Sequence, residues 1–146
     1  MVSWLFASVP SYYDYISRCD QRPMYQHLRA QMQYLQWQDG GARGRPWIMK
    51  SPIHINALDV LLETFPDAVL VHCHRDLQKV LPSFASLIET ARQIGSDHVD
   101  PKAVGSEMFN YWATALDRYL IERKKLPPDR ILDMQFEEVV GNIVDV

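Results

Sequence analysis

The sequence is poor in the features that mark several classes of protein. It has only two cysteines in 146 residues, too few for a disulfide framework, and Cys73 lies in an apolar run, as a reduced core cysteine would. It carries 15 basic against 18 acidic side chains, a net charge of −3, so we expect no general nucleic-acid binding. Its first residues, "MVSWLFASVPSYY", contain no basic segment and only a short apolar run. We therefore expect neither a signal peptide nor a membrane span, and a cytoplasmic location.

What remains is the composition of a globular protein. The chain is 47% hydrophobic and 23% charged, and its length suits one domain with a core of its own. Its hydrophobic patterns indicate helices at about 12–20 and 24–38, then an alternation of strands and helices. The expected strands lie at 47–50, 68–73 and 130–136, and the expected helices between and after them at 55–65, about 79–94, 102–125 and 137–142.

This alternation predicts an α/β fold with a parallel sheet and right-handed crossovers. We expect one domain, with a helical flank at 1–45 and an α/β part at 46–146. The β-branched run "AVLVHC" indicates a strand that is covered on both faces. Pro82 lies early in the helix that follows, so we expect that helix to begin near Lys79 or to kink there.

Polar residues follow the strand at 68–73, where a parallel sheet collects its ligands. Arg75 leaves this strand where the next helix begins, and the free amides of a helix N-terminus favour an anion. Ser83 lies on a polar stripe of the same helix. An arginine fork with a serine hydroxyl makes a sound phosphate clamp. The alternative is that Arg75 pairs with a carboxylate and Ser83 only fills a polar face.

The stretch "WIMKSPIH" has the same arrangement. Lys50 ends an expected strand, Ser51 suits a helix cap, and Pro52 suits the first helical position. A lysine beside a helix N-terminus repels the positive end of the dipole unless an anion lies between them. His54 in the first turn is a candidate base. The alternatives are a surface lysine and a histidine whose hydrogen bonds are satisfied within the fold.

Three stretches in series resemble the sulfotransferase family that uses 3′-phosphoadenosine 5′-phosphosulfate (PAPS), and more narrowly its bacterial-type branch. They are "WIMKSPIH", "FPDAVLVHCHRDLQKVLPSFASL" and "RILDMQFEEVVGN", in the family's order. The resemblance implies a P-loop-NTPase-like, three-layer α/β fold around a parallel sheet. It also implies that PAPS is the co-substrate, that no metal is needed, and that the acceptor is a hydroxyl of a small molecule, glycan or lipid.

The resemblance assigns roles to four residues. Arg75 and Ser83 match the pair that binds the 3′-phosphate of the nucleotide. Lys50 matches the lysine at the sulfuryl-bearing phosphate end. Phe136 stands where many relatives place a tyrosine against the adenine, and it keeps the stacking face without the hydroxyl.

The general base is less well marked. Related enzymes have an acidic residue upstream of this region or a histidine near the lysine, which leaves His54 as the candidate. Three weaker candidates are Asp14, Asp20 and His27. Loops such as 95–101 and the N-terminal helices would select the acceptor.

One family feature has no match. The family begins with a strand and a loop that cradles the 5′-phosphosulfate, and nothing before Trp47 resembles it. "GGARGR" follows a helix and precedes a strand, the reverse of a phosphate cradle, and we interpret it as a connector. We therefore expect an N-terminally truncated, partial domain that is marginally stable or oligomeric and has no measurable sulfuryl transfer by itself.

Two alternatives to a sulfotransferase stay open. One is a non-catalytic remnant or interaction protein with at most 3′-phosphoadenosine affinity. The other is a kinase of related P-loop fold, which would show a Gly-Lys-Ser/Thr loop that this sequence does not contain.

Overall fold

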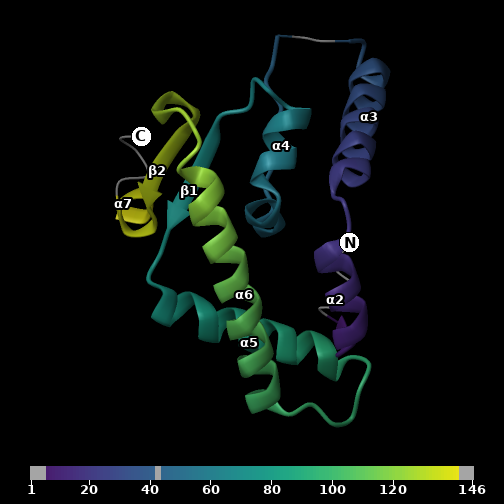
Figure 1. Ribbon diagram of the computed structural model, residues 1–146, viewed down its shortest axis with the longest axis vertical. Coiled ribbons are helices and arrows are strands. Elements are labelled where there is room, and N and C mark those ends of the chain that lie inside the picture. The colour runs from purple at the N-terminus through teal and green to yellow at the C-terminus, as the bar shows by residue number, and fades with distance from the viewer. Residues whose placement is uncertain (1–5, 42–43, 142–146) are drawn as a thin grey trace.

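A computed structural model describes residues 6–41 and 44–141 of the chain. A small parallel sheet lies at one side of the molecule, and most of the helices lie on the other side (Figure 1). The N-terminal elements are α2 (Pro10–Arg18), α3 (Arg22–Gln38), the 3₁₀ helix η1 (Pro52–Asn56) and α4 (Leu58–Thr64). They are followed by β1 (Leu70–His74), α5 (Leu77–Gln93), α6 (Pro101–Arg123), η2 (Pro128–Arg130), β2 (Ile131–Gln135) and α7 (Phe136–Gly141).

The sheet consists of two parallel strands, β1 and β2. Leu70 lies opposite Ile131, and the pairing continues in register to His74 opposite Gln135. The helices α5 and α6 connect the two strands, as a parallel pair requires. The predicted α/β class with its helical N-terminal flank is therefore confirmed.

The strand predicted at 47–50 does not form, so this prediction is wrong. Residues 45–51 have no regular secondary structure, and no strand of the described part of the chain pairs with them. Ile48 in this segment is 90% exposed. An apolar run forms a strand only where a neighbouring backbone takes up its N–H and C=O groups, and neither edge of the two-stranded sheet pairs with 47–50.

The helix after β1 begins earlier than predicted. Asp76 caps α5 by accepting a hydrogen bond from the Gln78 amide at 2.9 Å, so the helix starts at Leu77 and not near Lys79. Pro82 lies inside α5, where it removes one backbone N–H without ending the helix.

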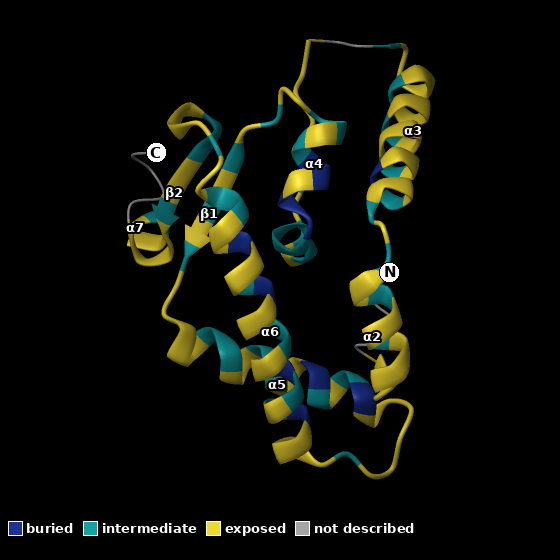
Figure 2. Cartoon of the chain, in the orientation of Figure 1, coloured by how far each residue is buried: buried dark blue, intermediate teal, exposed yellow. Residues whose placement is uncertain are grey.

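The core is divided into two small clusters, seen as separate groups of buried residues in Figure 2. The first lies between α5 and α6 and consists of Ile88, Val104 and Met108. The second lies between α3 and α4 and consists of Tyr25, Ala57, Val60 and Leu61.

The molecule is open for its size. Its accessible surface is 10732 Å², whereas a compact monomer of this mass exposes about 7,700 Å². Part of the excess lies on the sheet, where Val71 is 56% and Leu132 is 54% exposed. We predicted that β1 would be covered on both faces. This prediction is wrong, because α6 covers only the face with His72. Among the described residues, no helix is long and apolar enough to cross a membrane.

Candidate functional site

The carboxyl ends of the two strands bring Arg75 and Phe136 together. Each follows its strand at once, and the in-register pairing of His74 with Gln135 places the next residues side by side. The Arg75 guanidinium carbon lies 4.5 Å from the centre of the Phe136 ring. Such a cation–π contact contributes about 0.5–1 kcal/mol at an exposed site. The predicted anion-binding arginine and the predicted adenine-stacking ring therefore touch.

Ser83 belongs to the same region but touches neither residue. It is exposed on α5, six residues after Leu77 and so roughly 9 Å further along the helix axis. The first turn of α5 also carries its own carboxylate, because Asp76 caps the helix. The Asp76 carboxylate would repel an anion bound there and offset the attraction of the helix N-terminus. The Arg75 guanidinium would then be the main source of attraction.

A network of charged and polar side chains lies behind Arg75. His74 Nε2 is 2.5 Å from Asp133 Oδ1, and Arg123 holds both oxygens of the same carboxylate. The Tyr119 hydroxyl lies 2.6 Å from His72 Nδ1. The network ties β1, β2 and α6 together near the carboxyl ends of the two strands, where Arg75 and Phe136 follow.

The pKa values in this network follow from its contacts. The Arg123 guanidinium, and then His74, hold the pKa of Asp133 far below its usual range. The same pairing raises the pKa of Arg123. Burial, and then the neighbouring His74, lower the pKa of His72. Asp133 is therefore ionised at neutral pH, and His72 is uncharged.

Two histidines and a carboxylate are also a plausible metal-binding group. The donor atoms of His72, His74 and Asp133 lie within 4.8 Å of one another. Arg123, however, occupies both oxygens of Asp133, and its charge opposes a cation at that place. The residues fit an ion-paired network better than a metal centre.

The segment with Lys50 and His54 is built differently. The Ser51 hydroxyl accepts a hydrogen bond from the Ile53 amide at 3.4 Å, and Pro52 is the first residue of η1, so the predicted cap is confirmed. Lys50 is exposed before this turn. His54 Nδ1 lies 2.9 Å from the Tyr25 hydroxyl, and burial lowers the pKa of His54. His54 is thus neutral at pH 7.

No hydrogen bond, ion pair or ring contact joins Lys50 and His54 to Arg75, Ser83 and Phe136 within the described chain. The site residues fall into two groups, one at the strand ends and one beside η1. The weaker candidates for a base lie elsewhere: Asp14 pairs with Arg18, Asp20 pairs with Arg22, and His27 is exposed on α3.

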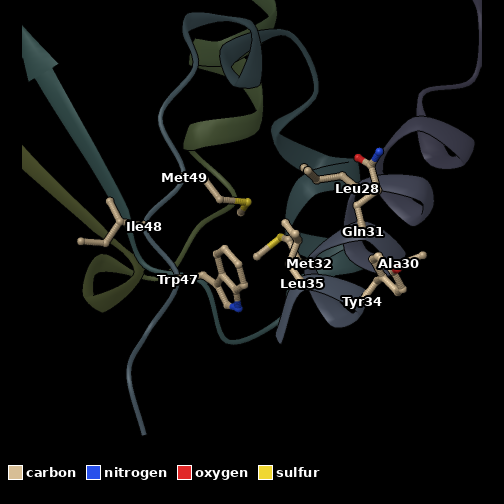
Figure 3. A pocket seen from close by; sticks show the side chains of 9 residues that line it. All are labelled: Leu28, Ala30, Gln31, Met32, Tyr34, Leu35, Trp47, Ile48 and Met49. Carbon is tan, nitrogen blue, oxygen red and sulfur yellow. The ribbon is translucent and has the colours of Figure 1, made fainter. Parts of the chain in front are cut away.

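An apolar groove lies beside the chain segment that precedes Lys50. It has a volume of about 650 Å³ and lies between α3 and the chain segment 47–49. Figure 3 shows Trp47, Met49 and Met32 turned toward one another, with Leu28 and Leu35 on the α3 side. The sequence did not indicate this groove, because its apolar run at 47–50 predicted a strand.

Parallel strands joined by helices, with an arginine at their carboxyl edge, define an α/β domain of the P-loop-like class. The chain belongs to the sulfotransferase family, whose family model matches residues 4–146.

Two curated relatives and one solved structure agree with this membership. The chain is 30% identical over 106 residues to the omega-hydroxy-beta-dihydromenaquinone-9 sulfotransferases Stf3 of Mycobacterium bovis and Mycobacterium tuberculosis. That alignment covers 68% of this chain and 26% of each relative, so the chain matches about a quarter of their length. The crystal structure of sulfotransferase STF1 from Mycobacterium tuberculosis superposes with a TM-score of 0.87 at 29% identity, over 98% of this chain and 39% of that one.

Proposed function

We propose that this chain is part of an enzyme that transfers a sulfuryl group from PAPS to an acceptor hydroxyl. The observation that carries the proposal is the contact between Arg75 and Phe136 at the carboxyl ends of β1 and β2. The contact supports the proposal because a cation that could bind phosphate lies beside an aromatic face that could stack on a base, at the edge where parallel sheets bind ligands.

In the proposed complex, Arg75 binds the 3′-phosphate and Ser83 adds a hydroxyl from α5. The Arg75 guanidinium covers one face of the Phe136 ring, and the adenine stacks on the other face. The network of His74, Asp133 and Arg123 keeps the end of β1 in place beside the end of β2. Charge-assisted hydrogen bonds to a phosphate are strong, so Arg75 supplies most of the selectivity.

Sulfuryl transfer is an in-line displacement through a loose transition state. The bond from sulfur to the nucleotide's phosphate oxygen breaks while a bond from sulfur to the acceptor oxygen forms. Negative charge grows on the departing phosphate oxygen, and Lys50 is the cation assigned to it. One preorganised donor of this kind contributes about 3–4 kcal/mol. No step of this scheme calls for a metal ion.

For the acceptor, we propose an alcohol on an apolar molecule. The groove between α3 and 47–49 is lined by Leu28, Met32, Leu35 and Trp47, and its last residue, Met49, directly precedes Lys50. Two relatives are named for a lipid-type hydroxyl acceptor. An apolar acceptor in the groove would bring its hydroxyl toward Lys50, and a glycan would leave the apolar lining without a partner.

The nucleotide site is tested by calorimetry with adenosine 3′,5′-bisphosphate. Arg75→Ala should weaken binding roughly 10- to 100-fold, as expected for the loss of a charged hydrogen-bonded contact. Arg29→Ala, at an exposed position on α3, is the matched control and should leave the affinity unchanged. Equal losses in both variants, or none in either, would overturn the assignment.

Two further measurements separate the alternatives, an assay of sulfuryl transfer for the remnant and a titration with ATP and Mg²⁺ for the kinase. A non-catalytic remnant would bind the bisphosphate through Arg75 but would transfer no sulfuryl group even when the rest of the family's domain is supplied. A kinase of related fold would prefer ATP with Mg²⁺ over the bisphosphate.

A further inference from the structure

Tyr25 and His54 form a hydrogen bond between the buried core and the proposed reaction region. We propose that Tyr25 is a positioning residue whose hydroxyl donates to Nδ1 of His54, which fixes the neutral ring with its proton on Nε2. His54 then acts as a hydrogen-bond donor to an oxygen of the sulfuryl or phosphate group, not as the base that takes the acceptor's proton. The last step rests on the proposed function; the direction of the hydrogen bond does not.

The geometry limits the tautomers to two. Tyr25 Oη lies 2.9 Å from His54 Nδ1, so one of the two atoms donates and the other accepts. If Nδ1 carries the proton, the Tyr25 oxygen accepts, and Nε2 is the free lone pair that a general base needs. If the Tyr25 hydroxyl donates, Nδ1 is the acceptor and Nε2 carries N–H.

The surroundings of Tyr25 favour the second arrangement. Its side chain is 1% exposed and packs in the apolar cluster with Ala57, Val60 and Leu61. Within the described part of the chain, its hydroxyl has no hydrogen-bond partner other than His54. A hydroxyl proton turned away from His54 would have no acceptor among the described residues, and a buried donor without an acceptor costs about 1–3 kcal/mol.

Tyr25 also keeps the proton that it must donate. Burial, and then the charge of Asp59, raise the pKa of Tyr25 to about 12. Asp59 is itself paired with Arg118 at 3.3 Å. The phenol is thus protonated at every physiological pH, and the imidazole beside it is neutral.

This arrangement changes the role of His54. A neutral N–H on Nε2 stabilises negative charge without carrying a charge of its own, which suits an oxygen that gains charge in the transition state. The acceptor's proton then leaves to water as the new bond between oxygen and sulfur forms. The loose transition state makes such a late proton loss acceptable, because little charge builds on the attacking oxygen.

The direct test is ¹⁵N NMR of the histidine rings in the wild-type chain. We expect the His54 spectrum of a protonated Nε2 and an unprotonated Nδ1 at neutral pH. Protonated Nδ1 with a bare Nε2 would overturn the proposal. No variant is needed, so a folding defect cannot obscure the result.

The second measurement is the pKa of His54 in Tyr25→Phe. This variant keeps the buried ring, and Tyr34→Phe on the exposed side of α3 is its matched control. A hydroxyl that donates to Nδ1 stabilises the neutral ring, so its removal should raise the pKa of His54. A fall, or no change, would contradict the proposal, because a hydroxyl that accepts from Nδ1 stabilises the protonated ring. Neither readout involves nucleotide, so failure here is distinct from failure of the sulfotransferase proposal.

Discussion

The paired strands β1 and β2 and the segment 47–50 have different structures, although β1 and 47–50 have similar sequence patterns, each a short apolar run that leads to a cation. In the first region each strand has the other as its hydrogen-bonding neighbour, and Arg75 is set beside Phe136. In the second region the run "WIMK" has no neighbouring strand and stays irregular. Apolar residues indicate that a segment will be covered, but its partner decides whether it becomes a strand.

The two regions also differ in how their charged residues are held. Arg75 lies against an aromatic ring, and His74 just before it belongs to an ion-paired network that joins β1 to β2. Lys50 is exposed, and the turn after it is capped by the hydrogen bond from the Ile53 amide to the Ser51 hydroxyl. We therefore expect nucleotide binding to depend on the ends of β1 and β2. We expect the segment 47–50 to contribute mainly to the transfer of the sulfuryl group.

The largest expected effect is on stability. Leu70→Ala in β1 removes a side chain that packs against the α3–α4 cluster, and we expect unfolding to become about 1–2 kcal/mol easier. Ile48→Ala is the matched change in 47–50 and should stay within about 0.5 kcal/mol, because Ile48 is 90% exposed. Urea denaturation of both variants measures the difference. Equal losses would mean that 47–50 is packed as well as β1 is.

A smaller effect should appear in acid. The pKa of Asp133 is lowered by Arg123 and His74 in the folded state, so its ionised form stabilises the fold above the unfolded pKa, about 3.9. That contribution is lost as pH falls from about 5 toward the folded pKa. Asp133→Asn should thus lower the melting temperature by more at pH 7 than at pH 2.

The contrast with an ordinary surface pair gives the control. Asp14→Asn breaks an exposed ion pair with Arg18 and should change the melting temperature little at either pH. If Asp133→Asn behaves in the same way, the network does not hold β1 to β2.

Much of the fold follows from the sequence, for reasons that can be named. The patterns of α3, α6, β1 and β2 predicted those elements within a few residues, because the helices have long apolar stripes and the strands are short, mostly apolar segments. Parallel pairing then brought Arg75 and Phe136 to one edge, as expected.

The missed features depend on contacts between distant residues. Asp133 meets His74 across 59 positions, and Tyr25 meets His54 across 29. Two histidines at alternating positions of a strand, His72 and His74, were the available signal for a shared polar face. Their partners could not be predicted without the strand register.

The central claim is that Arg75 at the end of β1 recognises a 3′-phosphate beside the Phe136 ring. The most direct measurement is the ratio of the affinities of the wild-type chain for adenosine 3′,5′-bisphosphate and for AMP, which differ by that one phosphate. The account predicts that the bisphosphate binds at least about tenfold more tightly, as one charged hydrogen-bonded contact provides. Equal affinity for the two nucleotides would contradict it.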